Sequence, residues 1–361
     1  MFAIANWKTA LLIAVVFVIL LVKYSYQATH QDAELSLRQL YSGPIDSWPE
    51  PWVDEGVDWQ EMASIPELPE PDPSLVALGE RLFFDPQLSA SRQISCASCH
   101  KPELAFADAR RVSLGHNEQE GKRNSPSILL SGHFQEQFWD GRAASLEEQV
   151  LMPIEDPLEM AFTLPALQQR LQGDDTYLAA FAQISGEPVI SLEIMSQALS
   201  AYIRSLQWEP TPFDRFIQGD RQALDDEALL GLHLFRTKAR CMNCHHGPLL
   251  SDQQYHNLGL TYYGRRYEDL GRYLVTGNIE DVGAFRTPTL RGVSKTGPWM
   301  HNGLFPTLEG VLRMYNAGMP RPQPNENQAQ DPLFPETSKL LKPLDLSEAE
   351  IMALKHFLEQ L

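Results

Sequence analysis

Two short motifs carry the residue types and spacing best suited to chemistry in this chain. The segments C-A-S-C-H (96–100) and C-M-N-C-H (241–245) both follow the pattern C-x-x-C-H. In this pattern two thiols add across the two vinyl groups of a haem, and the adjacent histidine binds the iron. The spacing therefore predicts two covalently bound c-type haems, held by Cys96, Cys99, His100, Cys241, Cys244 and His245.

The cysteine count agrees with this interpretation. The chain contains four cysteines, and the two motifs use all of them. Two disulfides, or a four-cysteine zinc site with histidines nearby by chance, are the alternatives. Neither alternative explains why a histidine follows each cysteine pair.

The sixth coordination position of each iron separates electron carriers, in which it is filled, from catalysts, in which it admits oxygen or peroxide. Met314 and Tyr315 are neighbours near the end of a predicted helix and can both bind iron. Helix neighbours point about 100° apart, so only one of them can face a given iron. A thioether is soft and favours ferrous iron, whereas a phenolate is hard and favours ferric iron. Core packing is the other role open to both side chains, and at least one must have it.

The elements that position these motifs occur twice along the chain. Helical apolar spacing over residues 73–84 and again over 224–235 leads into each motif. Amphipathic helices are predicted at 191–206 and 347–361, the second with a capping box made by Ser347 and Glu350. The starting cysteines of the two motifs lie 145 residues apart. This repeated order predicts a duplicated, mainly α fold with two haem domains in tandem.

The N-terminus carries an apolar segment. Residues 10–22 are uninterrupted apolar residues between Lys8 and Lys23, and residues 2–7 could lengthen the stretch to span a bilayer. No small-x-small cleavage site follows, because Tyr26 occupies the −3 position before Ala28. We expect an uncleaved helical anchor in the inner membrane, with a cleaved signal peptide as the alternative. Both place the remaining chain in the periplasm, as the attachment of c-type haem requires.

Composition divides the rest of the chain into segments. Residues 41–73 are rich in proline and acidic residues and contain three tryptophans, which predicts an extended tether lying partly on the globular body. A formal charge of −18 argues against a nucleic-acid partner and fits either a basic protein partner or simple solubility. The predicted units are a membrane or signal segment at 1–26, a tether at 27–72, and haem domains at 73–206 and 207–361.

Two long loop regions extend this interpretation. Residues 113–162 contain S-L-G-H, F-W-D-G-R-A and P-I-E-D-P-L-E-M, and residues 285–316 contain H-N-G followed by the Met-Tyr pair. These motifs, in order within residues 73–361, resemble the bacterial dihaem cytochrome c peroxidase family, which includes the methylamine-utilisation enzyme MauG. The resemblance implies two mostly helical, cytochrome c-like domains. It also implies that the N-terminal haem reacts with peroxide while the C-terminal haem handles electrons.

The resemblance assigns roles to residues that would otherwise suit the surface or the core. His116 matches the family's displaceable distal histidine, which ligates iron reversibly. Glu159 matches the distal carboxylate, which takes a proton from one peroxide oxygen and returns it to the other. Pro153 matches a residue lining the same pocket. Trp139 matches the tryptophan that lies between the haems and relays electrons.

The resemblance also implies a calcium ion between the domains, held by Asn124, Thr296 and Pro298 through a side-chain oxygen and backbone carbonyls. The family's axial methionine falls fourteen residues after the histidine of H-N-G, and Tyr315 occupies that position here. MauG has a tyrosine there. Tyr315 therefore agrees with MauG, with Met314 as the alternative ligand, whereas His116 follows the peroxidase pattern.

Three functions remain open from the sequence. The first is a peroxidase that reduces hydrogen peroxide with electrons from a small redox protein, such as a cytochrome c or a copper protein. The second is a MauG-like oxidase that uses peroxide to modify a protein substrate. The third is a dihaem electron carrier without catalysis, against which Glu159 counts because a carrier needs no distal acid. The family resemblance further implies a homodimer.

Overall fold

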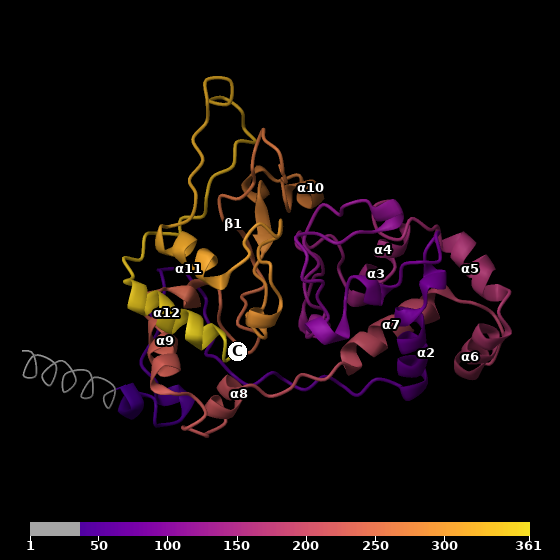
Figure 1. Cartoon of the computed structure of the whole chain (residues 1–361), viewed down its shortest axis with the longest axis horizontal. Coiled ribbons are helices and arrows are strands. Elements are labelled where there is room, and N and C mark those ends of the chain that lie inside the picture. The colour runs from indigo at the N-terminus through magenta and orange to yellow at the C-terminus, as the bar shows by residue number, and fades with distance from the viewer. Residues whose placement is uncertain (1–36) are drawn as a thin grey trace, which may run out of the picture.

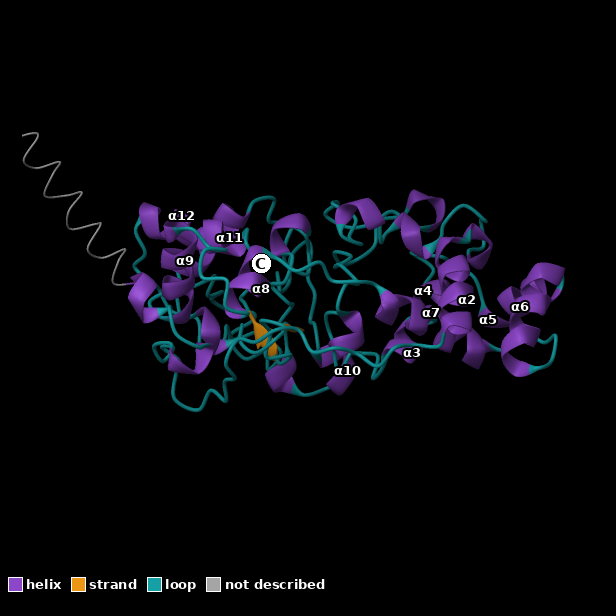
Figure 2. Ribbon diagram, turned by 90° about the horizontal axis from the view of Figure 1, so that it is seen from below, coloured by secondary structure: helices purple, strands orange, loops and turns teal. Residues whose placement is uncertain are grey.

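The computed structural model describes residues 37–361 and is mainly helical, with long loops and little sheet (Figures 1 and 2). The only sheet in this part of the chain is an antiparallel pair in which Tyr255 lies opposite Arg286. The prediction of a mainly α fold is confirmed. The elements are α2 (Pro73–Phe84), α3 (Leu146–Gln149), α4 (Met152–Glu155), α5 (Leu164–Gln172), α6 (Asp175–Ser185), α7 (Leu192–Ser205), α8 (Pro212–Ile217), α9 (Asp226–Arg236), β1 (Tyr255–Asn257), α10 (Tyr273–Thr276), β2 (Ala284–Arg286), α11 (Leu308–Asn316) and α12 (Glu348–Leu358).

The helices gather in two lobes, each built around one pair of packed helices. Figure 1 shows α2 to α7 on one side of the molecule and α8 to α12 on the other. In the first lobe α2 packs on α7, and in the second α9 packs on α12. Each lobe has its own hydrophobic core, one around Leu82 and Met195 and the other around Leu232 and Leu354. The helix before each C-x-x-C-H motif thus packs against the closing helix of the same lobe, as expected for a duplicated plan.

Local sequence signals explain where these helices begin. The Asp72 side chain accepts hydrogen bonds from the backbone at the start of α2, and Pro73 occupies its first turn. At α12 the predicted capping box forms: the Glu350 N–H donates to the Ser347 hydroxyl, and the Ser347 N–H donates to the Glu350 carboxylate. These caps satisfy backbone N–H groups that the helices themselves leave without partners.

The proline-rich segment before α2 is held against the second lobe. Tyr41, Trp48 and Met62 are buried in the core of that lobe. Arg236, which is fully buried in α9, donates to the Glu61 carboxylate at 2.9 Å and to the carbonyl of Pro49 at 2.8 Å. The tether is therefore part of the second lobe's core, although the sequence predicted only partial contact. The domain boundaries themselves stay a prediction.

The predicted membrane segment lies outside the described residues. Within residues 37–361, no helix combines the length and apolar character needed to cross a bilayer.

Two glycines allow the helix pairs to approach closely. A Cβ atom added to Gly79 in α2 would fall on the carbonyl oxygen of Ala198 in α7, and one added to Gly231 in α9 would fall on that of Ala353 in α12. Both glycines occupy the same place in the repeated pattern L-G-x-x-L-F. The duplicated sequence thus preserves the contact that sets the spacing within each lobe.

Gly79→Ala and Gly231→Ala are each expected to lower the free energy of unfolding by about 1–3 kcal/mol, because the obstructing atom is backbone and the helices must separate. Thermal unfolding of the haem-loaded protein measures the change. Gly173→Ala is the control, since its new Cβ would lie 3.4 Å from the Arg170 carbonyl oxygen, an ordinary contact. Unchanged unfolding in the first two variants would contradict the close-packing argument.

Candidate functional site

Both C-x-x-C-H motifs begin with a tight 3-10 turn, over Cys96–Ser98 and Cys241–Asn243. The His100 N–H donates to the Cys96 carbonyl at 2.9 Å, and the His245 N–H donates to the Cys241 carbonyl at 2.8 Å. None of the four cysteines is in a disulfide. In the described chain, the residues that could hold a metal together are Cys244, Asp252 and His256, so the four-cysteine zinc alternative is not formed.

The two histidines are prepared for iron in the same way. The ring Nδ1 of His100 lies 3.1 Å from the Phe106 carbonyl, and that of His245 lies 2.9 Å from the Leu250 carbonyl. A proton on Nδ1 donated to a carbonyl leaves the Nε2 lone pair free for a metal. Burial lowers the pKa of both rings, which favours the neutral, ligating form.

Both motifs open onto one cavity of about 1300 Å³ between the lobes. Ordinary small-molecule pockets measure roughly 300–1000 Å³, so this cavity is large enough for unusually large ligands. Its walls also carry buried donors with no hydrogen-bond partner in the protein: Arg240 Nε, Asn243 Nδ2, Arg286 Nη1 and Asn302 Nδ2. Buried donors without partners are costly unless a ligand supplies acceptors. Haem propionates are such acceptors, so the residues present fit two haems.

Glu159 lies on the cavity wall beside the first motif. It follows α4, and its backbone N–H donates to the Asp156 carbonyl at 3.0 Å. Burial raises the pKa of Glu159 to about 7, with a further increase from the Asp156 charge and an opposing effect from Arg142. A carboxyl with this pKa can both accept and donate a proton at neutral pH. Pro153, in α4, lines the same cavity.

A backbone hydrogen bond joins His116 to Glu159. The His116 N–H donates to the Glu159 carbonyl at 2.7 Å, and Gly115 packs directly on the backbone of residues 158–159. The Nδ1 atom of His116 is buried without a hydrogen-bond partner. The cavity lining includes Gly115 but not His116. Ligation of iron by His116 therefore stays a prediction.

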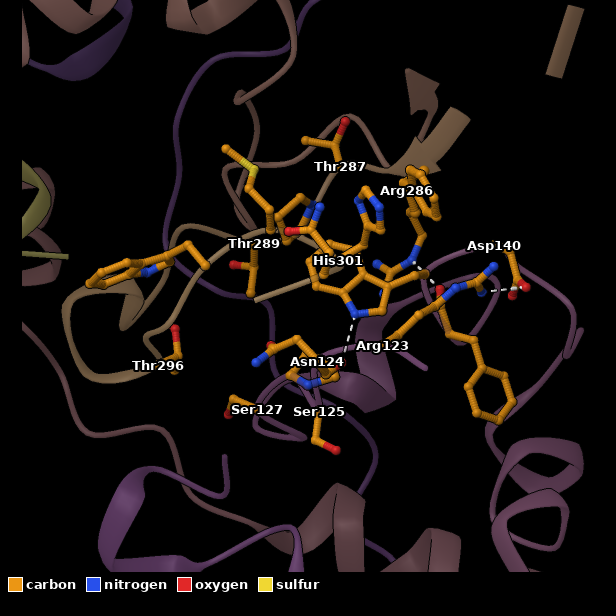
Figure 3. Close-up of a pocket in the computed structure, with 18 of the residues that line it drawn as sticks. Arg123, Asn124, Ser125, Ser127, Asp140, Arg286, Thr287, Thr289, Thr296 and His301 are labelled. Carbon is orange, nitrogen blue, oxygen red and sulfur yellow. Dashed lines mark hydrogen bonds and ion pairs between the residues drawn. The ribbon is translucent and has the colours of Figure 1, made fainter. Parts of the chain in front are cut away.

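Asn124 of the first lobe and Arg286 of the second both lie on the cavity wall (Figure 3), and Trp139 is hydrogen-bonded to both. Its indole N–H donates to the Asn124 carbonyl at 2.9 Å, and its own carbonyl accepts from the Arg286 backbone N–H at 2.8 Å. The side chain also lines the cavity shared by the two motifs. Trp139 is thus fixed to both lobes at once, which suits a group that must keep constant distances to two cofactors.

Met314 and Tyr315 behave differently on α11. Tyr315 lines the cavity along with Cys241, Cys244 and His245, whereas Met314 is not among the lining residues. Burial raises the pKa of Tyr315, with a smaller contribution from the thiols of Cys244 and Cys241. An isolated phenol there is neutral, and a ferric iron would favour its ionised form. Which of the two binds iron stays a prediction.

The three predicted calcium ligands line the same cavity. Asn124 is buried, and its Nδ2 donates to the Arg110 carbonyl at 3.0 Å, which leaves the side-chain oxygen available to a cation. Thr296 and Pro298 lie on the facing lobe. Calcium binding remains a prediction.

Ion pairs that the sequence did not predict join the two lobes. Arg123, next to Asn124, donates to Asp269 of the second lobe at 2.7 and 2.8 Å and also pairs with Asp140. Beside it, the His301 ring stacks on Phe285 at 3.6 Å, and burial lowers the pKa of His301 to about 3. No local pattern links residues 123 and 269, so only the folded structure shows this contact.

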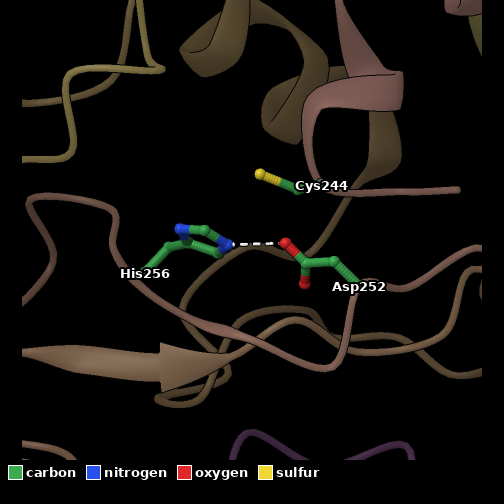
Figure 4. Close-up of side chains that lie close together, drawn as sticks. All are labelled: Cys244, Asp252 and His256. Atoms are coloured by element: carbon green, nitrogen blue, oxygen red, sulfur yellow. Dashed lines mark hydrogen bonds and ion pairs between the residues drawn. The ribbon is translucent and has the colours of Figure 1, made fainter. Parts of the chain in front are cut away.

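Asp252 and His256 were also missed, although their i,i+4 spacing soon after the second motif was a usable signal. His256 Nε2 lies 2.8 Å from Asp252, near the Cys244 sulfur (Figure 4). Because haem attachment uses Cys244, these three residues are better explained as support for the attached edge of the haem than as a separate metal site.

A mainly helical chain that repeats one lobe and directs two C-x-x-C-H motifs onto one cavity is, by class, a dihaem c-type protein. The family model described as di-haem cytochrome c peroxidase matches residues 73–222. The chain is 34% identical over 334 residues to cytochrome-c peroxidase IdrP1 of Pseudomonas sp. strain SCT, covering 83% of this chain and 85% of that protein. It is 37% identical over 244 residues to the methylamine utilization protein MauG of Methylophilus methylotrophus, covering 66% and 71%.

A solved structure supports the same family. The crystal structure of a MauG-like protein associated with microbial copper homeostasis matches with a TM-score of 0.71 and 30% identity, covering 86% of this chain and 95% of that one. The chain therefore belongs to the di-haem cytochrome c peroxidase/MauG family. It is a haem oxidoreductase of the peroxidase type with two c-type haems.

Proposed function

We propose that this chain reduces hydrogen peroxide at the N-terminal motif with electrons that enter through the C-terminal motif from a small redox protein. The observation that carries this proposal is Glu159, a carboxyl with a pKa of about 7 on the cavity wall beside the first motif. When bound, the haem iron supplies the redox chemistry that breaks the oxygen–oxygen bond.

The protein's own contribution is to move protons and position the donor. Glu159 takes a proton from one peroxide oxygen and returns it to the oxygen that departs as water. Glu159 serves in turn as base and acid because the two forms have nearly equal free energy at neutral pH. Trp139, held by Asn124 and Arg286, provides an aromatic group between the lobes for electron transfer.

Tyr315 supports a second candidate function, a MauG-like oxidase that modifies a protein substrate. A phenolate ligand stabilises ferric iron and makes its reduction by an ordinary donor less favourable. The position of Tyr315 on the cavity lining, where Met314 is not found, favours this alternative over a methionine-ligated electron-entry haem. The non-catalytic carrier is disfavoured by Glu159.

The partners and location follow from charge and cofactor. The chain's formal charge of −18 favours a basic electron donor, whose reduction of the protein would slow at high salt. Covalent haem attachment and family membership support a periplasmic location. We further propose one calcium ion at Asn124, Thr296 and Pro298; membrane anchoring and a homodimer remain predictions from the sequence and the family.

Trp139→Phe tests the proposed electron route. We expect oxidation of a reduced small cytochrome c or copper protein by peroxide to slow by about tenfold, equivalent to ~1.4 kcal/mol of barrier. The first reaction of the protein with peroxide should change little, because Glu159 is intact. Steady-state and single-turnover stopped-flow measurements separate the two. Trp208→Phe is the matched control, because Trp208 also donates its indole N–H, to Asp214 at 2.9 Å, but does not line the cavity.

The second function would replace the first on two results together. Neither the wild type nor a variant would oxidise any small redox protein, and mass spectrometry would detect peroxide-dependent oxidation of a protein. Equal slowing in Trp139→Phe and Trp208→Phe would contradict a specific role for Trp139.

A further inference from the structure

Tyr255, at the start of β1, forms a tyrosine–carboxylate pair that the proposed function does not use. Its hydroxyl donates to Glu136 of the first lobe at 2.6 Å. Arg272 pairs with the same carboxylate at 3.0 Å and stacks over the Tyr255 ring, 3.7 Å from the ring centroid. One phenol is thus held by a base and a cation at the junction of the lobes.

Two sets of contacts link this tyrosine–carboxylate pair to Trp139, one through the β1–β2 ladder and one through the loop that carries the tryptophan. Tyr255 faces Arg286 across the β1–β2 ladder, and the Arg286 N–H donates to the Trp139 carbonyl at 2.8 Å. The Tyr255 hydroxyl also lies against Gly141, two residues after Trp139, so closely that a Cβ added there would overlap it. The side chain therefore touches the same loop that carries the tryptophan.

On its other side Tyr255 reaches a surface hollow of about 590 Å³. Polar side chains form its rim, including Gln135, Gln254 and Asp281. His256 lines both this hollow and the large cavity. Tyr255 itself lines this hollow, which is large enough for one aromatic ring, and it is linked to the large cavity through the neighbouring His256 and through Gly141 on the Trp139 loop.

The local chemistry suits loss of one electron from the phenol. Although burial alone would raise it, hydrogen bonds from Tyr255 and Arg272 hold the pKa of Glu136 below its usual value, so Glu136 is an anion at neutral pH. Burial and the bond to Glu136 raise the pKa of Tyr255, so the phenol keeps its proton until it is oxidised. An oxidised phenol is a strong acid, and the carboxylate 2.6 Å away can accept its proton directly.

We propose that Tyr255 and Glu136 form a redox dyad that carries oxidising equivalents of peroxide from the cavity to the surface hollow, where a phenolic donor is oxidised. This inference rests on the proposed reaction with peroxide. It adds a second place where electrons enter, separate from the redox-protein route.

The reaction balances as follows. Tyr255 gives one electron to the oxidised cofactor pair, its O–H bond breaks, and the proton moves to Glu136. A phenol in the hollow then gives one electron to the tyrosyl radical and releases its proton to solvent, while Glu136 returns the stored proton to Tyr255. Two such cycles convert two phenols to phenoxyl radicals and supply two electrons and two protons, which reduce one hydrogen peroxide to two waters.

Tyr263 offers a matched comparison within the same lobe. Its hydroxyl also donates to a carboxylate, Asp331, yet Tyr263 lines neither the cavity nor the hollow. Tyr263→Phe therefore removes the same kind of hydrogen bond without interrupting the proposed route.

The test combines freeze-quench EPR with a phenol assay on the haem-loaded protein. After one equivalent of peroxide, the wild type and Tyr263→Phe should show a tyrosyl radical whose signal narrows with ring-deuterated tyrosine. Tyr255→Phe should lose that signal and oxidise guaiacol about tenfold more slowly. Glu136→Gln keeps a hydrogen-bond acceptor but no base, so it should lower both the tyrosyl radical signal and the guaiacol rate. In every variant the bleaching of the haem absorption by peroxide should proceed normally.

Two results separate the possible failures. An unchanged tyrosyl radical and guaiacol rate in Tyr255→Phe, with normal haem bleaching, would overturn the dyad and leave the proposed function intact. A wild-type protein whose haem absorption does not respond to peroxide would overturn the proposed function and the dyad together.

Discussion

Glu159→Gln is expected to lower the rate of reaction with hydrogen peroxide by about 10²–10⁴-fold, the usual contribution of a positioned acid–base group. Glutamine preserves the size and polarity of the side chain but cannot accept the peroxide proton. The haems should still attach and show normal absorption, because Glu159 belongs to neither motif. Stopped-flow measurement of the bimolecular reaction gives the rate directly.

The pH profile makes this prediction specific. Because burial raises the pKa of Glu159 to about 7, the side chain is neutral below that pH and ionised above it. The first step needs the carboxylate, so the wild-type rate should rise as pH increases through about 7 and then level off. Asp156→Asn removes a charge that raises this pKa, and should move the midpoint to lower pH.

The control is a neighbouring carboxyl on α4. Glu155 is exposed and does not line the cavity, so Glu155→Gln should leave both the rate and the pH profile unchanged. A flat wild-type profile between pH 5 and 9, or a Glu159→Gln rate equal to that of the wild type, would show that another group moves the proton.

Short sequence patterns predicted most of the structural features that depend on residues close together in the chain. The C-x-x-C-H spacing, the Ser347–Glu350 capping box and the repeated helices each depend on residues a few positions apart, and the structure has the box and the helices. The family motifs likewise predicted the class of enzyme. In each case neighbouring residues determine the feature, so a short window of sequence contains it.

The contacts between distant segments could not be predicted in this way. Arg123 with Asp269 and Tyr255 with Glu136 join residues more than a hundred positions apart, and nothing near either partner specifies the other. The packing of the tether on α9 through Arg236 is similar. The first two pairs depend on how the two lobes meet, and Arg123 and Asp269 line the cavity to which the proposed function is assigned.

Tyr315→Phe should change the ferric spectra of the second haem, whereas Met314→Leu should not. Tyr315 lines the cavity with Cys241 and His245, and Met314 does not. Loss of a phenolate ligand should alter the low-spin EPR signal and raise the reduction potential of that haem, because an anionic oxygen stabilises ferric iron. Low-temperature EPR, near-infrared absorption and redox titration measure these changes.

Tyr315→Met provides the opposite test at the same position on α11. If its side chain reaches the iron, a sulfur-to-iron charge-transfer band should appear, and the potential should rise by roughly 0.1 V or more, within the ~0.8 V range over which axial ligands set haem potentials. A charge-transfer band already present in the wild type and lost in Met314→Leu would assign the ligand to Met314. That result would favour a haem that accepts electrons from a small redox protein. If the wild type lacks the charge-transfer band and only substitution of Tyr315 changes the haem spectra, the search should turn to a protein oxidised by peroxide, because a haem held ferric by phenolate accepts electrons poorly.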